Sequence, residues 1–121
     1  MPLISNVRRL STMTTLHIAE IPYESGAVHY RYARVLSGDG TRWVRHGLYV
    51  EYSESGEVLS EGNYVNGKEE GLWRSFHENG RRAAEGHYIA GKEEGVWLFW
   101  NLSGIPEEPA TYRNGEEVSA K

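Results

Sequence analysis

Three pairs of adjacent glutamates are the residues of this sequence whose types and spacing best fit a catalytic or metal-binding set. The pairs recur at intervals of 24 and then 23 residues and are Glu69 with Glu70, Glu93 with Glu94, and Glu116 with Glu117. Paired carboxylates serve as general acid and general base, or share a metal ion, when they lie within a few ångströms of each other. Either chemistry therefore depends on the distance that the fold places between the pairs.

A repeat of 24 residues organises the chain from Gly47 onward. Equivalent positions hold glycine at Gly47, Gly71 and Gly95, and an aromatic residue at Tyr49, Trp73 and Trp97. Each copy contains two short runs of aromatic and β-branched residues, separated by glycine-containing turns such as Asn79-Gly80. Asn-Gly favours the tight turn of a β-hairpin because both residues accept positive φ. The repeat predicts an all-β fold, an antiparallel meander of repeated β-hairpins in a single-layer or rolled sheet.

The repeat also predicts the domain organisation. Residues 1–12 match no unit, and we expect them to be disordered. Residues 13–121 are predicted to form one domain, with degenerate N-terminal hairpins over 13–46 and three units at 47–70, 71–94 and 95–118. Upstream strands are expected at residues 16–21, 27–36 and 42–52. Pro106 and Pro109 lack backbone donors, which suits a terminal edge strand.

The turns define a register for the sheet. We assume two-residue turns at Ser55-Gly56, Asn79-Gly80 and Ser103-Gly104, and four-residue loops at residues 66–69 and 90–93. Large rings then face glycines on the neighbouring strands: Gly62 lies opposite Tyr49 and Trp73, and Gly86 lies opposite Trp73 and Trp97. The neighbouring row alternates Gly47, Tyr64, Gly71, Tyr88, Gly95 and Tyr112. Rings can lie flat on the bare backbone of a glycine. On the opposite face, Arg74 is expected between Glu61 and Glu85.

This register argues against chemistry by the glutamate pairs. Equivalent glutamates lie two strands apart, about 9 to 10 Å, which is too far for a shared proton or a common small metal ion. They are also expected in loops open to water, where no apolar pocket separates their pKa values. Two interpretations stay open for these residues, a solvated acidic edge and a docking surface for a basic partner.

Other catalytic and metal-binding patterns are missing from the sequence. There is no cysteine, which excludes disulfides, thiolate metal sites and a cysteine nucleophile. The histidines lack the spacing of metal ligands, and the Ser and Thr residues lack a nucleophile elbow. We therefore predict that the protein is not an enzyme and holds no cofactor and no metal ion.

The charge is unevenly distributed along the chain. Residues 1–45 contain six Arg and three acidic residues, whereas residues 46–121 contain seven Lys and Arg against fourteen Glu. The acidic part repels nucleic acids and anionic lipids and suits a basic partner, although solubility is an equally simple explanation. No signal peptide and no membrane-spanning run is apparent, so we expect a cytoplasmic protein without direct membrane insertion.

Two segments of the repeat resemble a known family. AEGHYIAGKEEG, from Ala84 to Gly95, and EGNYVNGKEEG, from Glu61 to Gly71, look like the MORN repeat: Glu-Gly, any residue, an aromatic, then Asn-Gly-Lys and a further Gly. The Gly-x-Trp-x-x-aromatic run that begins at Gly71 is similar to the bacterial variant, often labelled antitoxin-like. The resemblance covers roughly residues 47–115. The third unit departs from it, because Pro109-Ala110 replaces Glu-Gly and Glu116 replaces Lys.

The resemblance implies a β-hairpin ribbon that associates with proteins or lipids and has no catalytic residues. The first hypothesis is a non-enzymatic protein-binding module, an antitoxin or immunity protein that neutralises a cognate bacterial toxin by direct binding. The alternative is a MORN-type scaffold for self-association or for membrane or protein localisation. The expected partner is a cognate toxin or another protein of basic charge, and a homo-oligomer stays open. The candidate partner-binding residues are Glu69, Glu70, Glu93 and Glu94 on the acidic edge, with Arg74, Phe76 and Trp100 on the opposite face.

Overall fold

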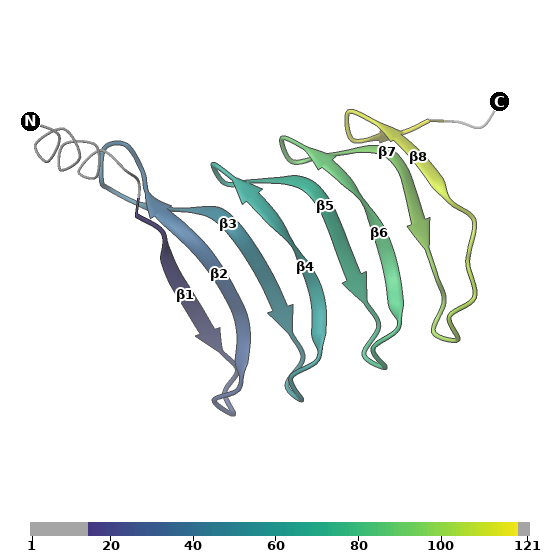
Figure 1. The fold of residues 1–121 in the computed structure, drawn as a ribbon, viewed down its shortest axis with the longest axis horizontal. Helices are drawn as coiled ribbons and strands as arrows, with labels where there is room; N and C mark the ends of the chain where they lie inside the picture. Colours follow the sequence, from purple (N-terminus) through teal and green to yellow (C-terminus); the bar gives the residue numbers. More distant parts are fainter. Residues whose placement is uncertain (1–14, 119–121) are drawn as a thin grey trace, which may run out of the picture.

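Nine antiparallel strands form one open sheet in sequential order, β1 to β9 (Figure 1). The computed structural model describes residues 15–118, and none of these residues is helical. The strands are β1 (His17–Pro22), β2 (Val28–Leu36), β3 (Trp43–Tyr52), β4 (Val58–Val65), β5 (Lys68–Phe76), β6 (Arg82–Ile89), β7 (Lys92–Phe99), β8 (Ala110–Arg113) and β9 (Glu116–Glu117). The predicted all-β meander is confirmed, and the three upstream strands lie within one residue of their expected bounds. Residues 1–12, expected to be disordered, lie outside the described residues.

The turns at one end of the sheet are longer than predicted. Between β3 and β4, Ser53 N donates to Glu57 O at 2.8 Å and Gly56 N donates to Ser53 O at 3.0 Å, which leaves three residues in the turn. A bulge follows, because the register shifts between Glu51 and Tyr52. A three-residue turn with a one-residue bulge restores the register of a two-residue turn. The predicted partners beyond the bulge are therefore right, although the turn type was wrong.

The turns at the other end are shorter than predicted. Asn66 and Gly67 have φ of 50° and 84°, and Ala90 and Gly91 have φ of 50° and 86°, as two-residue hairpin turns require. The predicted four-residue loops are therefore wrong. Tyr64 pairs with Glu69 instead of Gly71, and Tyr88 pairs with Glu93 instead of Gly95. An irregularity between Glu61 and Asn63, repeated between Glu85 and His87, then shifts the register by two residues.

The predicted packing of rings on glycines is confirmed for both tryptophans. A Cβ atom added at Gly62 would lie 2.1 Å from the Trp73 ring, and one added at Gly86 would lie 2.1 Å from the Trp97 ring. Each indole is also held by a hydrogen bond, from Trp73 Nε1 to Asn63 O at 3.1 Å and from Trp97 Nε1 to His87 O at 3.2 Å. Only glycine leaves room for this contact.

Few side chains of the described residues are buried, namely those of Ala19, Ala33, Val35, Val50 and Trp97, and aromatic side chains pack against one another along one face of the sheet. Neighbouring ring centroids lie 5.1 to 6.3 Å apart along one face, through Tyr30, Tyr32, Tyr49, Tyr64, Trp73, Tyr88, Trp97 and Tyr112. Trp97 is buried, with 8% of its surface exposed. Rings at this spacing stabilise the sheet through burial and edge-to-face contacts. We call this the aromatic face.

Candidate partner-binding surface

A row of exposed aliphatic side chains crosses the sheet on the face opposite the rings. It consists of Ile18, Leu48, Leu72 and Val96, which are 58%, 63%, 37% and 57% exposed. Three of them directly precede Tyr49, Trp73 or Trp97 of the aromatic face, and Ile18 precedes Ala19, the cross-strand partner of Tyr32. Successive residues of a strand point to opposite faces. The four belong to alternate strands, β1, β3, β5 and β7, so they lie about 9 to 10 Å apart. We call this row the apolar stripe.

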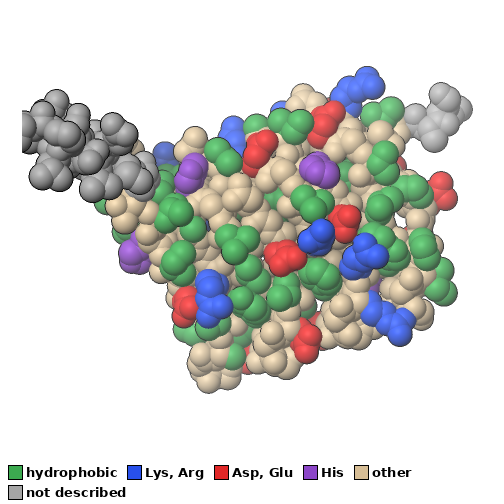
Figure 2. Space-filling view, viewed as in Figure 1, with side chains coloured by type: hydrophobic (Ala, Val, Ile, Leu, Met, Phe, Trp, Pro, Cys, Tyr) green, Lys and Arg blue, Asp and Glu red, His purple; other side chains and the backbone are tan. Residues whose placement is uncertain are grey.

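No second layer of the described chain covers the apolar stripe. On the face drawn in Figure 2, hydrophobic side chains lie in the open among Lys, Arg, Asp and Glu side chains. The strands between those of the apolar stripe contribute Asn63, opposite Leu48, and His87, opposite Leu72, to the same row. Exposed apolar side chains with polar neighbours are typical of interaction sites in soluble proteins. The apolar stripe is therefore the candidate surface for a partner.

An ion-pair ladder runs beside the apolar stripe, as predicted. Arg74 Nη1 lies 3.8 Å from Glu61 Oε2, and Arg74 Nε lies 3.4 Å from Glu85 Oε1. Because the Arg74 side chain is 44% exposed, each pair contributes a few tenths to about 1 kcal/mol at most. The ladder therefore adds little to the stability of the fold. It favours the observed register of β4, β5 and β6 and gives the apolar stripe a charged border.

Arg82 joins the three residues that were predicted as anchors on this face. Arg82 is the cross-strand partner of Phe76, and its guanidinium lies 4.6 Å from the centre of the Trp100 ring. Arg82 Nη1 also lies 3.6 Å from Glu85 Oε1, the same oxygen that Arg74 contacts. The sequence pointed to Arg74, Phe76 and Trp100 but missed Arg82. The assumed two-residue turn had placed Arg82 opposite His77, and only the longer turn brings it opposite Phe76.

The predicted acidic edge has a different local structure. Glu69 and Glu70 lie in β5, and Glu93 and Glu94 lie in β7; all four are half-buried, so their assignment to water-exposed loops is wrong. The short turns explain the error, because each strand starts two residues earlier than expected. Partner binding by these glutamates stays a prediction.

Two of these glutamates connect adjacent hairpins. Glu70 Oε1 accepts a hydrogen bond from Ala90 N at 2.9 Å, and Glu94 Oε1 accepts one from Asn114 N at 2.9 Å. His46, at the equivalent position one unit earlier, accepts from Asn66 N at 3.0 Å. We call these side chains the hairpin clasps. The 24-residue spacing of the glutamates is the signal that could have revealed them.

The other two glutamates lie beside tyrosines. Burial raises the pKa of Tyr64, and the Glu69 carboxylate adds to that shift. Burial and then the Glu93 carboxylate raise the pKa of Tyr88 in the same way. Both tyrosines therefore stay neutral over the physiological pH range, and their hydroxyls remain available as donors.

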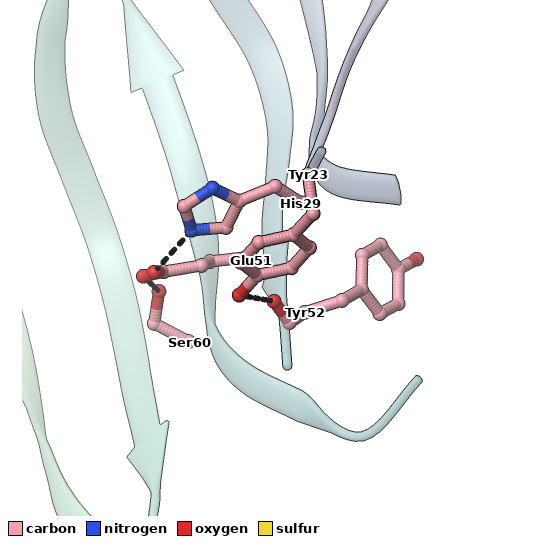
Figure 3. Close-up of polar contacts among 5 residues, drawn as sticks. All are labelled: Tyr23, His29, Glu51, Tyr52 and Ser60. Carbon is pink, nitrogen blue, oxygen red and sulfur yellow. Dashed lines mark hydrogen bonds and ion pairs between the residues drawn. The ribbon is translucent and has the colours of Figure 1, made fainter. Parts of the chain in front are cut away.

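A polar cluster at β2, β3 and β4 was not predicted (Figure 3). His29 Nε2 lies 3.1 Å from Glu51 Oε2, and Ser60 Oγ lies 3.5 Å from Glu51 Oε1. Nearby, Tyr23 Oη donates to Tyr52 O at 2.7 Å. In a hydrolase triad the imidazole lies between the carboxylate and the hydroxyl, so that it can take the hydroxyl proton. Here the carboxylate lies between the other two groups, so the arrangement differs from a hydrolase triad, and the cluster connects β2, β3 and β4.

Two further structural observations concern residues 15–118. No group of three His, Asp or Glu side chains in this part of the chain is placed to hold a metal ion. No helix in it has the length and apolar character needed to cross a membrane.

Comparison with protein families connects these hairpins to a known repeat. Comparisons with curated proteins and with solved structures return no match. The MORN repeat variant family matches residues 45–66 and 69–90. The first match spans β3 and β4 and the second spans β5 and β6, so one family unit corresponds to one hairpin of the sheet. Residues 45–66 and 69–90 of this chain are thus each similar to one MORN repeat variant unit.

Proposed function

We propose that the protein is a non-enzymatic protein-binding module and that its apolar stripe is the surface a partner covers. The stripe itself carries this proposal, because four aliphatic side chains with exposures of 37% to 63% lie in line on an uncovered face of the described chain. Burying such side chains stabilises a complex by about 25 cal/mol per Å² of apolar surface. MORN repeats agree with this class, since they suggest a protein-binding or scaffold module.

The spacing of the stripe favours a helical partner. An α-helix rises 1.5 Å per residue, so seven residues advance about 10.5 Å, close to the roughly 9 to 10 Å between alternate strands. An amphipathic helix laid across the strands can therefore place one apolar side chain on each of Leu48, Leu72 and Val96. Arg74 and Arg82 then border the helix on one side and can pair with its polar residues.

Within this class we propose an antitoxin or immunity role, in which the partner is a cognate toxin. The support is the resemblance to the bacterial variant of the repeat and the acidic charge of residues 46–121, which suits a basic toxin. The test is co-expression with the toxic product of a neighbouring reading frame. Restored growth is expected with the wild-type protein, and no effect on growth would contradict the antitoxin role.

The same assay tests the surface. Leu48→Asp and Leu72→Asp should abolish rescue, because each places a charge in the buried centre of the complex. Leu102→Asp is the matched control, since Leu102 is as exposed as Leu48, at 63%, but lies in the turn between β7 and β8. Equal loss of rescue in Leu102→Asp would remove the stripe from the proposal.

A scaffold that self-associates is the second candidate, favoured by the open edge at β1. Five of the six residues of β1 are exposed, with Ala19 the exception, and among residues 15–118 only β2 pairs with this strand. Unpaired backbone groups at such an edge can extend the sheet into a second copy. Sedimentation equilibrium tests this candidate: concentration-dependent association that Ile18→Pro abolishes would support it, and a monomer at all concentrations would contradict it.

A further inference from the structure

Three arginines line a cavity of about 290 Å³ near the turn between β2 and β3. They are Arg34, Arg42 and Arg45, and the walls include Tyr32 and Trp43. We call this cavity the arginine pocket. Arg45 lies two positions before Gly47 in β3, so the two residues share one face of the sheet, and its guanidinium lies close to the rings of the aromatic face. The arginine pocket therefore opens on the face opposite the apolar stripe.

The charges in the arginine pocket are not neutralised by the described chain. Arg34 and Arg45 are direct cross-strand partners, an arrangement in which like charges destabilise a sheet. Within residues 15–118, Arg31, Arg74 and Arg82 form ion pairs with glutamates, whereas Arg34, Arg42 and Arg45 form none. In a protein of net charge -4, the described residues thus leave three neighbouring arginines without a carboxylate partner.

Aromatic rings hold two of these arginines in place. The Arg34 guanidinium lies 4.2 Å from the centre of the Trp43 ring. The Arg45 guanidinium lies 5.2 Å from the centre of the Tyr32 ring and 5.5 Å from the centre of the Tyr64 ring. A stacked guanidinium contacts the ring through its face and keeps N–H donors in its plane free for another ligand. Arg34 uses one of them, because its Nε donates to His17 Nδ1 at 3.3 Å. The remaining donors are oriented in advance, which lowers the entropic cost of binding an anion.

We propose that the arginine pocket binds a soluble phosphate monoester. Guanidinium forks match the oxygens of phosphate in geometry, and three cations suit a group that carries close to two negative charges at neutral pH. The cavity of about 290 Å³ accommodates the phosphate and a small group that carries it. A soluble ligand is favoured over a lipid headgroup because the acidic residues 46–121 would be repelled by an anionic membrane.

Calorimetric titration at low ionic strength tests this proposal with glycerol phosphate, inorganic phosphate and acetate as probes. Saturable binding of one glycerol phosphate per chain is expected, with acetate at least about tenfold weaker because it carries a single charge. Arg42→Ala should weaken the affinity for glycerol phosphate about tenfold, since it removes charge-assisted hydrogen bonds. Arg45→Lys keeps the charge and loses the fork, and should weaken it to a similar degree.

Controls separate a built site from general attraction. Arg113→Ala removes an exposed arginine in β8 and should leave the affinity unchanged. Equal weakening in Arg113→Ala, or no saturable binding of glycerol phosphate, would overturn the proposal. So would binding seen only with vesicles that contain phosphatidic acid, which would assign the pocket to a membrane. Circular dichroism and the midpoint of thermal unfolding verify that each variant folds. Glycerol phosphate should raise the midpoint of the wild-type protein and of Arg113→Ala more than that of Arg42→Ala or Arg45→Lys.

Discussion

Glycine is required where a tryptophan lies on the backbone of the neighbouring strand. Gly62 and Gly86 hold this position beneath Trp73 and Trp97, and a single added carbon would overlap each ring. The indole N–H is fixed at the same time by a carbonyl of the preceding strand. A side chain at either glycine would therefore displace the indole ring and break the hydrogen bond of its N–H group. The overlap cannot be relieved by moving a single atom of the ring.

The first prediction concerns Gly86→Ala. The new Cβ would lie 2.1 Å from the Trp97 ring, so the free energy of unfolding should fall by about 1 to 3 kcal/mol. Urea denaturation followed by tryptophan fluorescence measures this loss. Gly38→Ala is the control, because nothing lies within 4 Å of its added Cβ, and its effect should stay within about 0.5 kcal/mol. Equal stability of the two variants would contradict the packing of Trp97 on Gly86.

The second prediction concerns Tyr49. Burial raises the pKa of Tyr49 from its ordinary value of 10.0 to about 12, with Glu51 as the next cause. The folded state thus holds the phenolic proton more tightly than the unfolded chain does. This contribution to stability is complete below pH 10.0 and is lost as the pH rises to about 12, because the unfolded chain ionises first.

Urea denaturation across this alkaline range checks the prediction for Tyr49. The free energy of unfolding of the wild-type protein should fall between pH 10.0 and pH 12. Tyr49→Phe has no proton to lose and should show a shallower fall over the same range. Parallel curves for the two proteins would mean that the phenol of Tyr49 titrates as it does in the unfolded chain.

At the scale of the elements, the β-hairpin is the repeating unit of the fold. Each hairpin is joined to the next by hydrogen bonds in addition to those between paired strands. The clasp from Glu70 reaches Ala90 N, and Gly91 N donates to Glu69 O at 2.9 Å. Both bonds connect β5 to the turn between β6 and β7. Adjacent turns are therefore held in line along one end of the sheet.

The third prediction tests the hairpin clasp of Glu70. Glu70→Ala leaves Ala90 N without its acceptor and should lower the free energy of unfolding by about 1 kcal/mol. Glu70→Gln keeps a side-chain oxygen at the same distance and should cost much less. Hydrogen exchange at the Ala90 amide measures the effect locally, with faster exchange in Glu70→Ala than in Glu70→Gln. Identical exchange in both variants would show that the clasp contributes nothing.

The fourth prediction uses the turn between β6 and β7, which has Ala90-Gly91 where the two equivalent turns have Asn66-Gly67 and Asn114-Gly115. Ala90 has φ of 50°, the same left-handed conformation that the equivalent residues Asn66 and Asn114 adopt with φ of 50° and 55°. Asparagine tolerates this conformation better than alanine does, so Ala90→Asn should stabilise the protein by about 0.5 to 1 kcal/mol. Thermal unfolding measures the gain, and Asn66→Ala, the reverse change, should lose a similar amount. A lower midpoint for Ala90→Asn would contradict this account.

At the scale of the whole molecule, the sheet is one-dimensional. Each strand pairs only with its neighbours in sequence, and no described element crosses either face (Figure 1). Stability therefore accumulates from neighbour to neighbour, as in other repeat arrays, and both faces remain available to ligands. The apolar stripe and the arginine pocket lie on opposite faces, so the two proposed sites do not compete for the same surface.

The fifth prediction follows from this one-dimensional order. β9 has two residues and β8 has four, so the C-terminal end of the sheet has the least support. Backbone amides of β8 should exchange with solvent faster than those of β5 and β6 in the middle of the sheet, because the ends of an array fray first. Hydrogen exchange read by NMR measures the gradient. Uniform protection from β2 to β8 would indicate a single cooperative unit instead.

Much of this protein is determined by the sequence alone, because the relevant signals are local and repeated. Alternation of aromatic and polar residues with a 24-residue period predicts the strands, and glycine beside tryptophan predicts their packing. The ion pairs of Arg74 follow from the same register. The predicted turns were wrong at both ends of the sheet, yet most strand partners survived, since a longer turn with a bulge and a shorter turn with a shift restore the same pairing.

Tertiary structure decided the features that depend on side chains meeting across several strands. The hairpin clasps, the position of Arg82 and the cluster around Glu51 join residues about 20 positions apart or require the correct turn length. The arginine pocket needs a cross-strand pair of like charges, an arrangement that pairing preferences in a sequence argue against. The backbone path brings these groups together, because bulges and turns choose which side chains become neighbours.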